Sequence, residues 1–134
     1  MVAYEDAEPS GLALMLGGLI EQNLARDPGR RRLLRSSVVA IEARDAEVSV
    51  TIMLAPGGAL IGGGFDRGAH VRIRTDSARL LALATAPLRF GLPDPFSRAG
   101  REVVRDIAAR RIEVAGMISH PRRLARLTML LSAD

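Results

Sequence analysis

The feature that most constrains the fold is the strict alternation of apolar and polar residues over Glu47–Leu54. Successive side chains of a strand point to opposite faces, so the apolar residues of this stretch would share one face. Residues Ala69–Thr75 alternate in the same way. The two stretches therefore predict a sheet with one buried face. The residues expected to face covering helices are Val48, Val50, Ile52, Val71 and Ile73.

Further strand-like runs lie before and after this pattern. Ser37–Ala43 and Ala59–Phe65 are apolar, and turn signals such as Pro56–Gly58 separate the runs. Tight turns join antiparallel neighbours, so the first four runs are expected to form an antiparallel meander. A fifth strand is predicted over Arg111–Ala115.

Four segments have helical spacing. Ser10 is a plausible N-cap for a helix to about Arg26, and Asp76 or Thr75 for a helix from Ser77. The expected helices are Gly11–Arg26, Ser77–Ala86, Ser97–Arg110 and a terminal helix from Pro121. These elements predict an α+β fold, with a five-stranded, mostly antiparallel sheet covered on one face by helices. Residues 1–9 are expected to be an acidic flexible leader, and 10–134 a single domain.

Composition bears on the location of the protein. The chain has 134 residues, no cysteine and a net charge of +4. The leader carries Glu5, Asp6 and Glu8 and no basic residue, which is the wrong sign for a secretory signal. The apolar run Leu12–Ile20 is shorter than the ~20 residues that a membrane-spanning helix needs. A soluble cytoplasmic protein is expected.

The sequence offers few groups for catalysis. It has no lysine, so Gly62–Gly64 is not a Walker phosphate loop. His70 and His120 have no second histidine or carboxylate at ligand spacing in the sequence. We expect a non-enzymatic protein with no catalytic residue, no metal site and no cofactor.

Three sequence features carry a family resemblance. Thr75–Ser77 leads into a leucine-rich helix. The alternating stretch Ile112–Ala115 ends at a lone glycine, Gly116, and the terminal helix has paired leucines. This order resembles the sterol carrier protein type-two family of sterol-binding domains, over roughly Ser37–Ser132. The resemblance departs from the family pattern at Pro87–Ala109, which is long and carries an added helix.

The resemblance implies a lipid-binding carrier domain that holds a sterol, a fatty acid or an acyl-CoA in an apolar cavity between sheet and helices. The loop Pro87–Phe96 would form the cavity mouth, and Arg89 or Arg98 would meet an acidic head group. The residues expected to line the cavity are Leu16, Leu19, Met53, Leu81, Phe90, Met117 and Met129.

Two other functions remain open. The same fold could serve as a structural or dimerisation module with a filled core. The arginines of Arg30–Arg35 and of the terminal helix could bind nucleic acid, although the scarcity of aromatic side chains disfavours this. The expected partners are a hydrophobic small molecule, a transient membrane surface and a second copy of the chain.

Overall fold

The structure is a computed structural model, and it describes residues 2–80, 88–89, 92–93, 98–116 and 119–131. Its elements confirm the α+β class. The helices and the 3-10 helix η1 are α1 (Gly11–Arg26), η1 (Pro28–Leu33), α3 (Arg98–Ala108) and α4 (Pro121–Leu131). The strands are β1 (Val2–Tyr4), β2 (Ser37–Ala43), β3 (Val48–Ala55), β4 (Gly58–Gly63), β5 (Val71–Thr75), β6 (Leu88–Arg89), β7 (Leu92–Pro93) and β8 (Glu113–Ala115).

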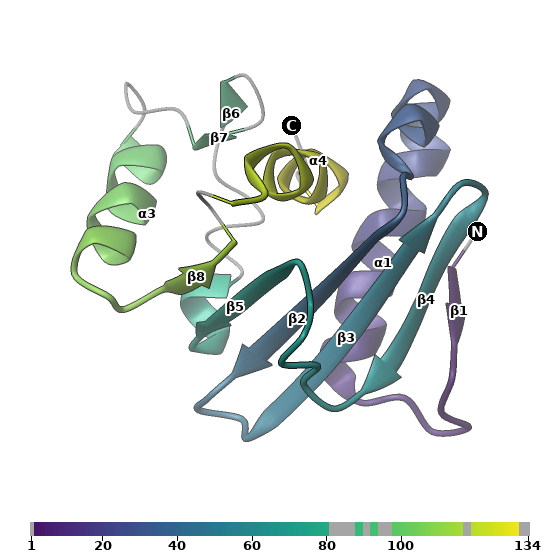
Figure 1. The fold of residues 1–134 in the computed structure, drawn as a ribbon, viewed down its shortest axis with the longest axis horizontal. Helices are drawn as coiled ribbons and strands as arrows, with labels where there is room; N and C mark the ends of the chain where they lie inside the picture. The colour runs from purple at the N-terminus through teal and green to yellow at the C-terminus, as the bar shows by residue number, and fades with distance from the viewer. Residues whose placement is uncertain (1, 81–87, 90–91, 94–97, 117–118, 132–134) are drawn as a thin grey trace.

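The main sheet has six strands in the order β1-β4-β3-β2-β5-β8, not the five that the sequence predicts (Figure 1). Strands β2, β3 and β4 form the expected antiparallel meander. Strand β5 does not continue it. It lies on the other side of β2 and runs parallel to it, while β8 pairs antiparallel with β5. The sheet is therefore mixed, with a majority of antiparallel pairs.

The sixth strand comes from the segment expected to be the leader. Val2–Tyr4 pairs in parallel with β4, and the Glu5 N–H donates to the Ile61 carbonyl at 2.9 Å. The Tyr4 ring packs over Gly17 of α1, where a Cβ would overlap its hydroxyl. The free edge of β4 and the absence of a side chain at Gly17 thus allow β1 to pair here, although three residues are too few to predict a strand from sequence.

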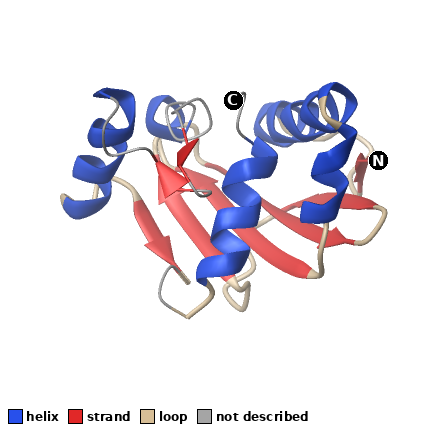
Figure 2. Cartoon of the chain, turned by 90° about the horizontal axis from the view of Figure 1, so that it is seen from above, coloured by secondary structure: helices blue, strands red, loops and turns tan. Residues whose placement is uncertain are grey.

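The alternation of β3 and β5 places their apolar side chains toward the helices, as predicted. Val50, Ile52, Val71 and Ile73 are each at most 1% exposed, whereas Val48 is half-buried. Helix α1 covers this face and lies behind the sheet in Figure 1, and Figure 2 shows the layers from above. We call the other face, which bears Glu42, Met53, Arg72 and Arg74, the open face.

Local signals set the helix starts. The Ser10 hydroxyl accepts a hydrogen bond from the Ala13 N–H at 3.2 Å, and Asp76 Oδ1 accepts one from the Arg79 N–H at 2.8 Å. Both predicted caps are confirmed. The segment Pro87–Phe96, expected to be an irregular loop, contains the short antiparallel hairpin β6–β7.

Candidate functional site

Helices α1 and α4 lie side by side, and this brings together part of the predicted lipid site. The Asn23 side-chain amide donates to the Leu130 carbonyl at 2.7 Å, so α4 is fixed against α1. Leu16 is fully buried, and Leu19 and Met129 are half-buried against the same core. The predicted residues Leu16, Leu19 and Met129 thus border one apolar layer.

Other predicted site residues lie elsewhere. Met53 is 38% exposed on the open face, because its position in β3 points it away from α1. The Arg98 side chain is 91% exposed at the start of α3, 3.9 Å from Glu102. Arg89 lies in β6. The remaining predicted residues, Leu81, Phe90 and Met117, lie outside the residues that the structure describes.

Four side chains of the described apolar layer are fully buried. Leu16 and Ile20 of α1, Ile52 of β3 and Leu130 of α4 are all 0% exposed and belong to one cluster.

The two histidines come together in space, which their separation in the sequence did not indicate. Their ring centroids are 5.2 Å apart in an edge-to-face arrangement. Nδ1 of His70 accepts a hydrogen bond from the Val38 N–H at 2.9 Å, and Nη1 of Arg123 lies 3.0 Å from Nδ1 of His120. Within the described ranges, no group of three or more histidine or acidic side chains could hold a metal ion.

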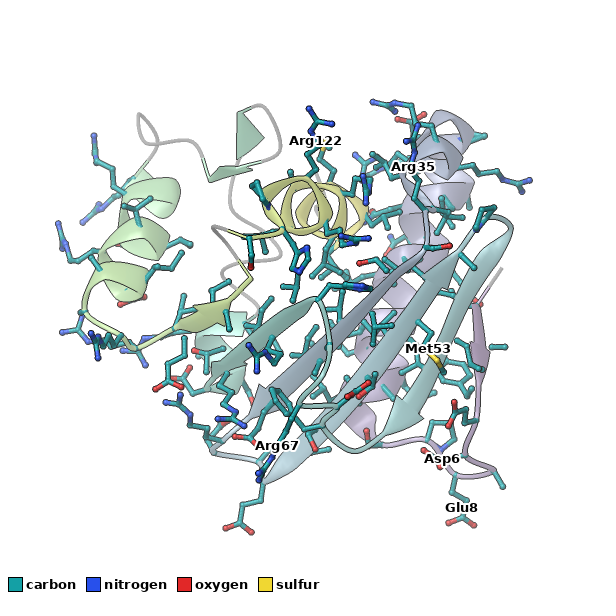
Figure 3. The ribbon with its side chains drawn as sticks, viewed as in Figure 1. Asp6, Glu8, Arg35, Met53, Arg67 and Arg122 are labelled. Atoms are coloured by element: carbon teal, nitrogen blue, oxygen red, sulfur yellow. The ribbon has the colours of Figure 1, made fainter. Side chains whose placement is uncertain are left out.

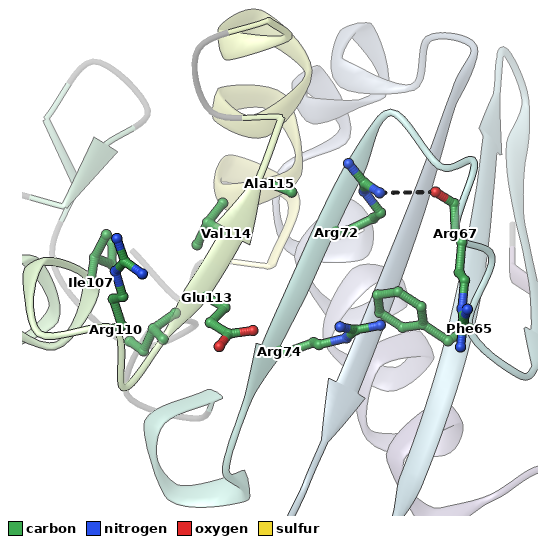
Figure 4. A pocket seen from close by; sticks show the side chains of 10 residues that line it. Phe65, Arg67, Arg72, Arg74, Ile107, Arg110, Glu113, Val114 and Ala115 are labelled. Carbon is green, nitrogen blue, oxygen red and sulfur yellow. Dashed lines mark hydrogen bonds between the residues drawn. The ribbon is translucent and has the colours of Figure 1, made fainter.

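A cleft of about 730 Å³ lies at the end of the open face (Figure 4). We call it the arginine cleft. Strands β5 and β8 form its floor, the C-terminal end of α3 borders one side, and Phe65 and Arg67 border the other. It is lined by Phe65, Arg67, Arg72, Arg74, Ile107, Arg110, Ile112, Glu113, Val114 and Ala115.

The pairing of β5 with β8 creates this cleft. Arg72 lies opposite Ala115 and Arg74 opposite Glu113, so these side chains share the open face. Sequence alternation assigned Arg72 and Arg74 to a polar face. The sequence pattern did not predict that Arg110 would line the same cleft, because the position of Arg110 depends on how the chain turns between α3 and β8.

Figure 3 draws the side chains of the described residues, with Asp6 and Glu8 at one side and Arg67 near the turn before β5. Asp6 Oδ2 accepts from the Gly63 N–H at 2.9 Å, so the acidic segment is held at the β4 end of the open face. The arginine cleft lies at the β8 end. The open face is therefore acidic toward one edge and basic toward the other.

No helix in the described part of the chain has the length and apolar character needed to cross a bilayer. No protein-family model and no curated protein matches the sequence. A solved structure described as a "UbiJ-SCP2 Ubiquinone synthesis protein" superposes with a TM-score of 0.60 at 18% identity, covering 92% of this chain and 99% of that one. At this level of identity the match concerns the fold. The chain therefore has the sterol-carrier-like fold that its sequence predicts.

Proposed function

We propose that this protein is a non-enzymatic lipid-binding carrier domain. The observation that carries the proposal is the match of nearly the whole chain to a sterol-carrier-type structure. A fold alone does not imply a function. The half-buried Leu19 and Met129 beside the apolar layer add support, since ligand pockets are mostly lined by apolar side chains.

The proposed ligand is a sterol, a fatty acid or an acyl-CoA. The similar structure is a ubiquinone synthesis protein, so a quinone with a long prenyl tail joins these candidates. All four classes have an extended apolar body and a smaller polar end. Such a molecule would contact the half-buried Leu19 and Met129, and the sequence adds Leu81, Phe90 and Met117 as further lining residues.

Native mass spectrometry of the purified protein, followed by titration with a fluorescent fatty acid and a fluorescent sterol, tests this proposal. Leu19→Ala should weaken binding by about 1–2 kcal/mol, or roughly five- to thirtyfold, through lost apolar contact. Leu14→Ala is the matched control, because Leu14 lies on the same helix and is 51% exposed. Absence of co-purified lipid together with no saturable binding would reject the carrier function.

The second candidate is a structural or dimerisation module of the same fold. The fully buried side chains of Leu16, Ile20, Ile52 and Leu130 favour it, because a filled interior needs no ligand for its stability. Sedimentation over a range of protein concentrations distinguishes this candidate. A dimer that binds no lipid would place it first.

A further inference from the structure

The arginine cleft lies on the open face, away from the layer between α1 and the sheet. Four guanidinium groups surround it, and they come from three parts of the chain. Arg72 and Arg74 belong to β5, Arg67 to the turn before it, and Arg110 to the end of α3. These four arginines are not neighbours in one charged stretch of sequence, and it is the fold that brings them together.

Neutral partners hold the two arginines of β5. The Arg74 guanidinium lies over the Phe65 ring, 4.4 Å from its centroid. Nη1 of Arg72 donates to the Arg67 carbonyl at 3.0 Å (Figure 4). A ring face and a carbonyl orient a guanidinium without cancelling its charge. Both groups therefore keep their positive charge toward the cleft.

The carboxylates beside the cleft are too few to balance these charges. Glu113 is engaged by Arg44, with 2.7 Å between Oε2 and Nη2. Glu42 Oε1 is 3.9 Å from Nε of Arg74, which is too far for a hydrogen bond. Among the residues that line the cleft, four arginines stand against one carboxylate, Glu113, so the lining carries a net charge of +3.

Arg110 reaches the cleft through an unusual backbone conformation. The Arg110 N–H donates to the Ile107 carbonyl at 3.1 Å, and the Arg111 N–H donates to the Asp106 carbonyl at 2.8 Å. These bonds form a Schellman motif, in which Arg110 has a φ of 60° at the position that glycine usually occupies. The chain thus holds an arginine in a strained position at the rim of a basic cleft.

An apolar wall completes the cleft. The half-buried Ile107 and Ala115 line the side formed by α3 and β8, and Ile112, which is 1% exposed, lies beneath them. The cleft volume of about 730 Å³ falls within the range of small-molecule sites. The site therefore combines a multiply charged cationic surface with an apolar surface beside it.

We propose that the arginine cleft binds a phosphate-bearing ligand with two or more negative charges, at a site separate from the proposed lipid site. Guanidinium groups pair with phosphate oxygens through two parallel hydrogen bonds, and several arginines suit a polyanion. The phosphate would belong either to a soluble diphosphate or to a lipid head group whose apolar part contacts Ile107 and Ala115. Both sources share the chemistry that the cleft recognises.

Calorimetric titration at low ionic strength tests the site with two probes. Inorganic pyrophosphate represents the soluble source, and dihexanoyl phosphatidic acid represents the head group, with dihexanoyl phosphatidylcholine as its zwitterionic control. Arg67→Gln and Arg110→Gln should each weaken binding of the preferred probe about five- to tenfold. Arg101→Gln is the matched control, because it removes one exposed charge from α3 outside the cleft.

Each outcome decides the proposal. Pyrophosphate binding that is weakened only by the two cleft variants supports a soluble source, and the same pattern with phosphatidic acid alone supports a head group. No saturable binding of either probe, or equal weakening in all three variants, would overturn the site. Fatty-acid binding measured on the same proteins should not change with the cleft variants. A parent protein that carries no co-purified lipid and binds neither the fatty acid nor the sterol would reject the carrier function and leave the cleft proposal intact.

Discussion

The Val38 backbone N–H donates to Nδ1 of His70 at 2.9 Å. This bond joins β2 to the residue that precedes β5, at the point where the parallel pairing of the two strands begins. A protonated imidazole has no lone pair at Nδ1, so the bond requires neutral His70. Burial, together with the nearby Arg123 and His120, lowers the pKa of His70 below its usual 6.5. The geometry and the charges therefore favour the same neutral state.

The first prediction concerns stability against pH. Because the pKa of His70 is lower in the folded protein than in the unfolded chain, the unfolded state binds more protons as the pH falls below about 6.5. The stabilisation from neutral His70 is fully present above pH 6.5 and is lost as the pH falls toward the lowered pKa. Urea unfolding between about pH 7.5 and 5.5 measures this loss.

His70→Asn separates this effect from general acid destabilisation. The Asn side-chain carbonyl can accept the Val38 N–H at the place of Nδ1 but does not titrate in this range. The variant should keep most of the stability at pH 7.5 and lose part of the slope below pH 6.5. An unchanged slope would show that His70 is not the titrating group.

The second prediction concerns Gly116, which follows β8. Gly116 has a φ of 94°, and a Cβ there would collide with the His70 carbonyl oxygen. Gly116→Ala should destabilise the fold by more than about 2 kcal/mol, from the left-handed conformation and the overlap together. Gly57→Ala is the matched control, since Gly57 has a φ of 99° and open space around it. Equal losses in the two variants would mean that the overlap contributes nothing.

The third prediction tests the assignment of faces in β3. Val50 is 0% exposed against the helices, and Met53 in the same strand is 38% exposed on the open face. Val50→Asp buries an unpaired charge and should remove several kcal/mol of stability, which is much of the margin of a domain of this size. Met53→Asp should cost less than about 1 kcal/mol. Thermal melting of both variants decides the assignment, and similar melting temperatures would contradict it.

The sequence was informative wherever local chemistry determines the structure. The caps at Ser10 and Asp76 form as predicted, because a short polar side chain satisfies a free N–H within one turn. The buried face of β3 follows from alternation, since a shift of one residue would expose the whole apolar set. These predictions needed no knowledge of the distant parts of the chain.

Features that depend on contacts between residues far apart in the sequence could not be predicted from the sequence. Val2–Tyr4 is too short to indicate a strand without the edge of β4, and β5 could have paired with β4 as well as with β2. The approach of His70 to His120 likewise arises only when β8 pairs with β5, because this pairing brings Gly116 and the turn to His120 beside His70. Met53 is a different case: it was assigned to the lipid site by residue type, although the alternation that turns Val50 and Ile52 toward the helices already predicts Met53 on the open face.

The last prediction concerns Arg110, whose conformation links stability to the arginine cleft. A left-handed conformation costs a non-glycine residue about 1–2 kcal/mol, and the extra backbone freedom of glycine in the unfolded chain offsets part of any gain. Arg110→Gly should therefore stabilise the fold by about 0.5–1 kcal/mol while it weakens phosphate binding. Urea unfolding and calorimetric titration of the same preparation measure both effects, and Arg110→Gln should lose binding without gaining stability. If Arg110→Gly loses stability, the side chain of Arg110 contributes more to the fold than its backbone strain costs, and the prediction of a more stable variant is wrong.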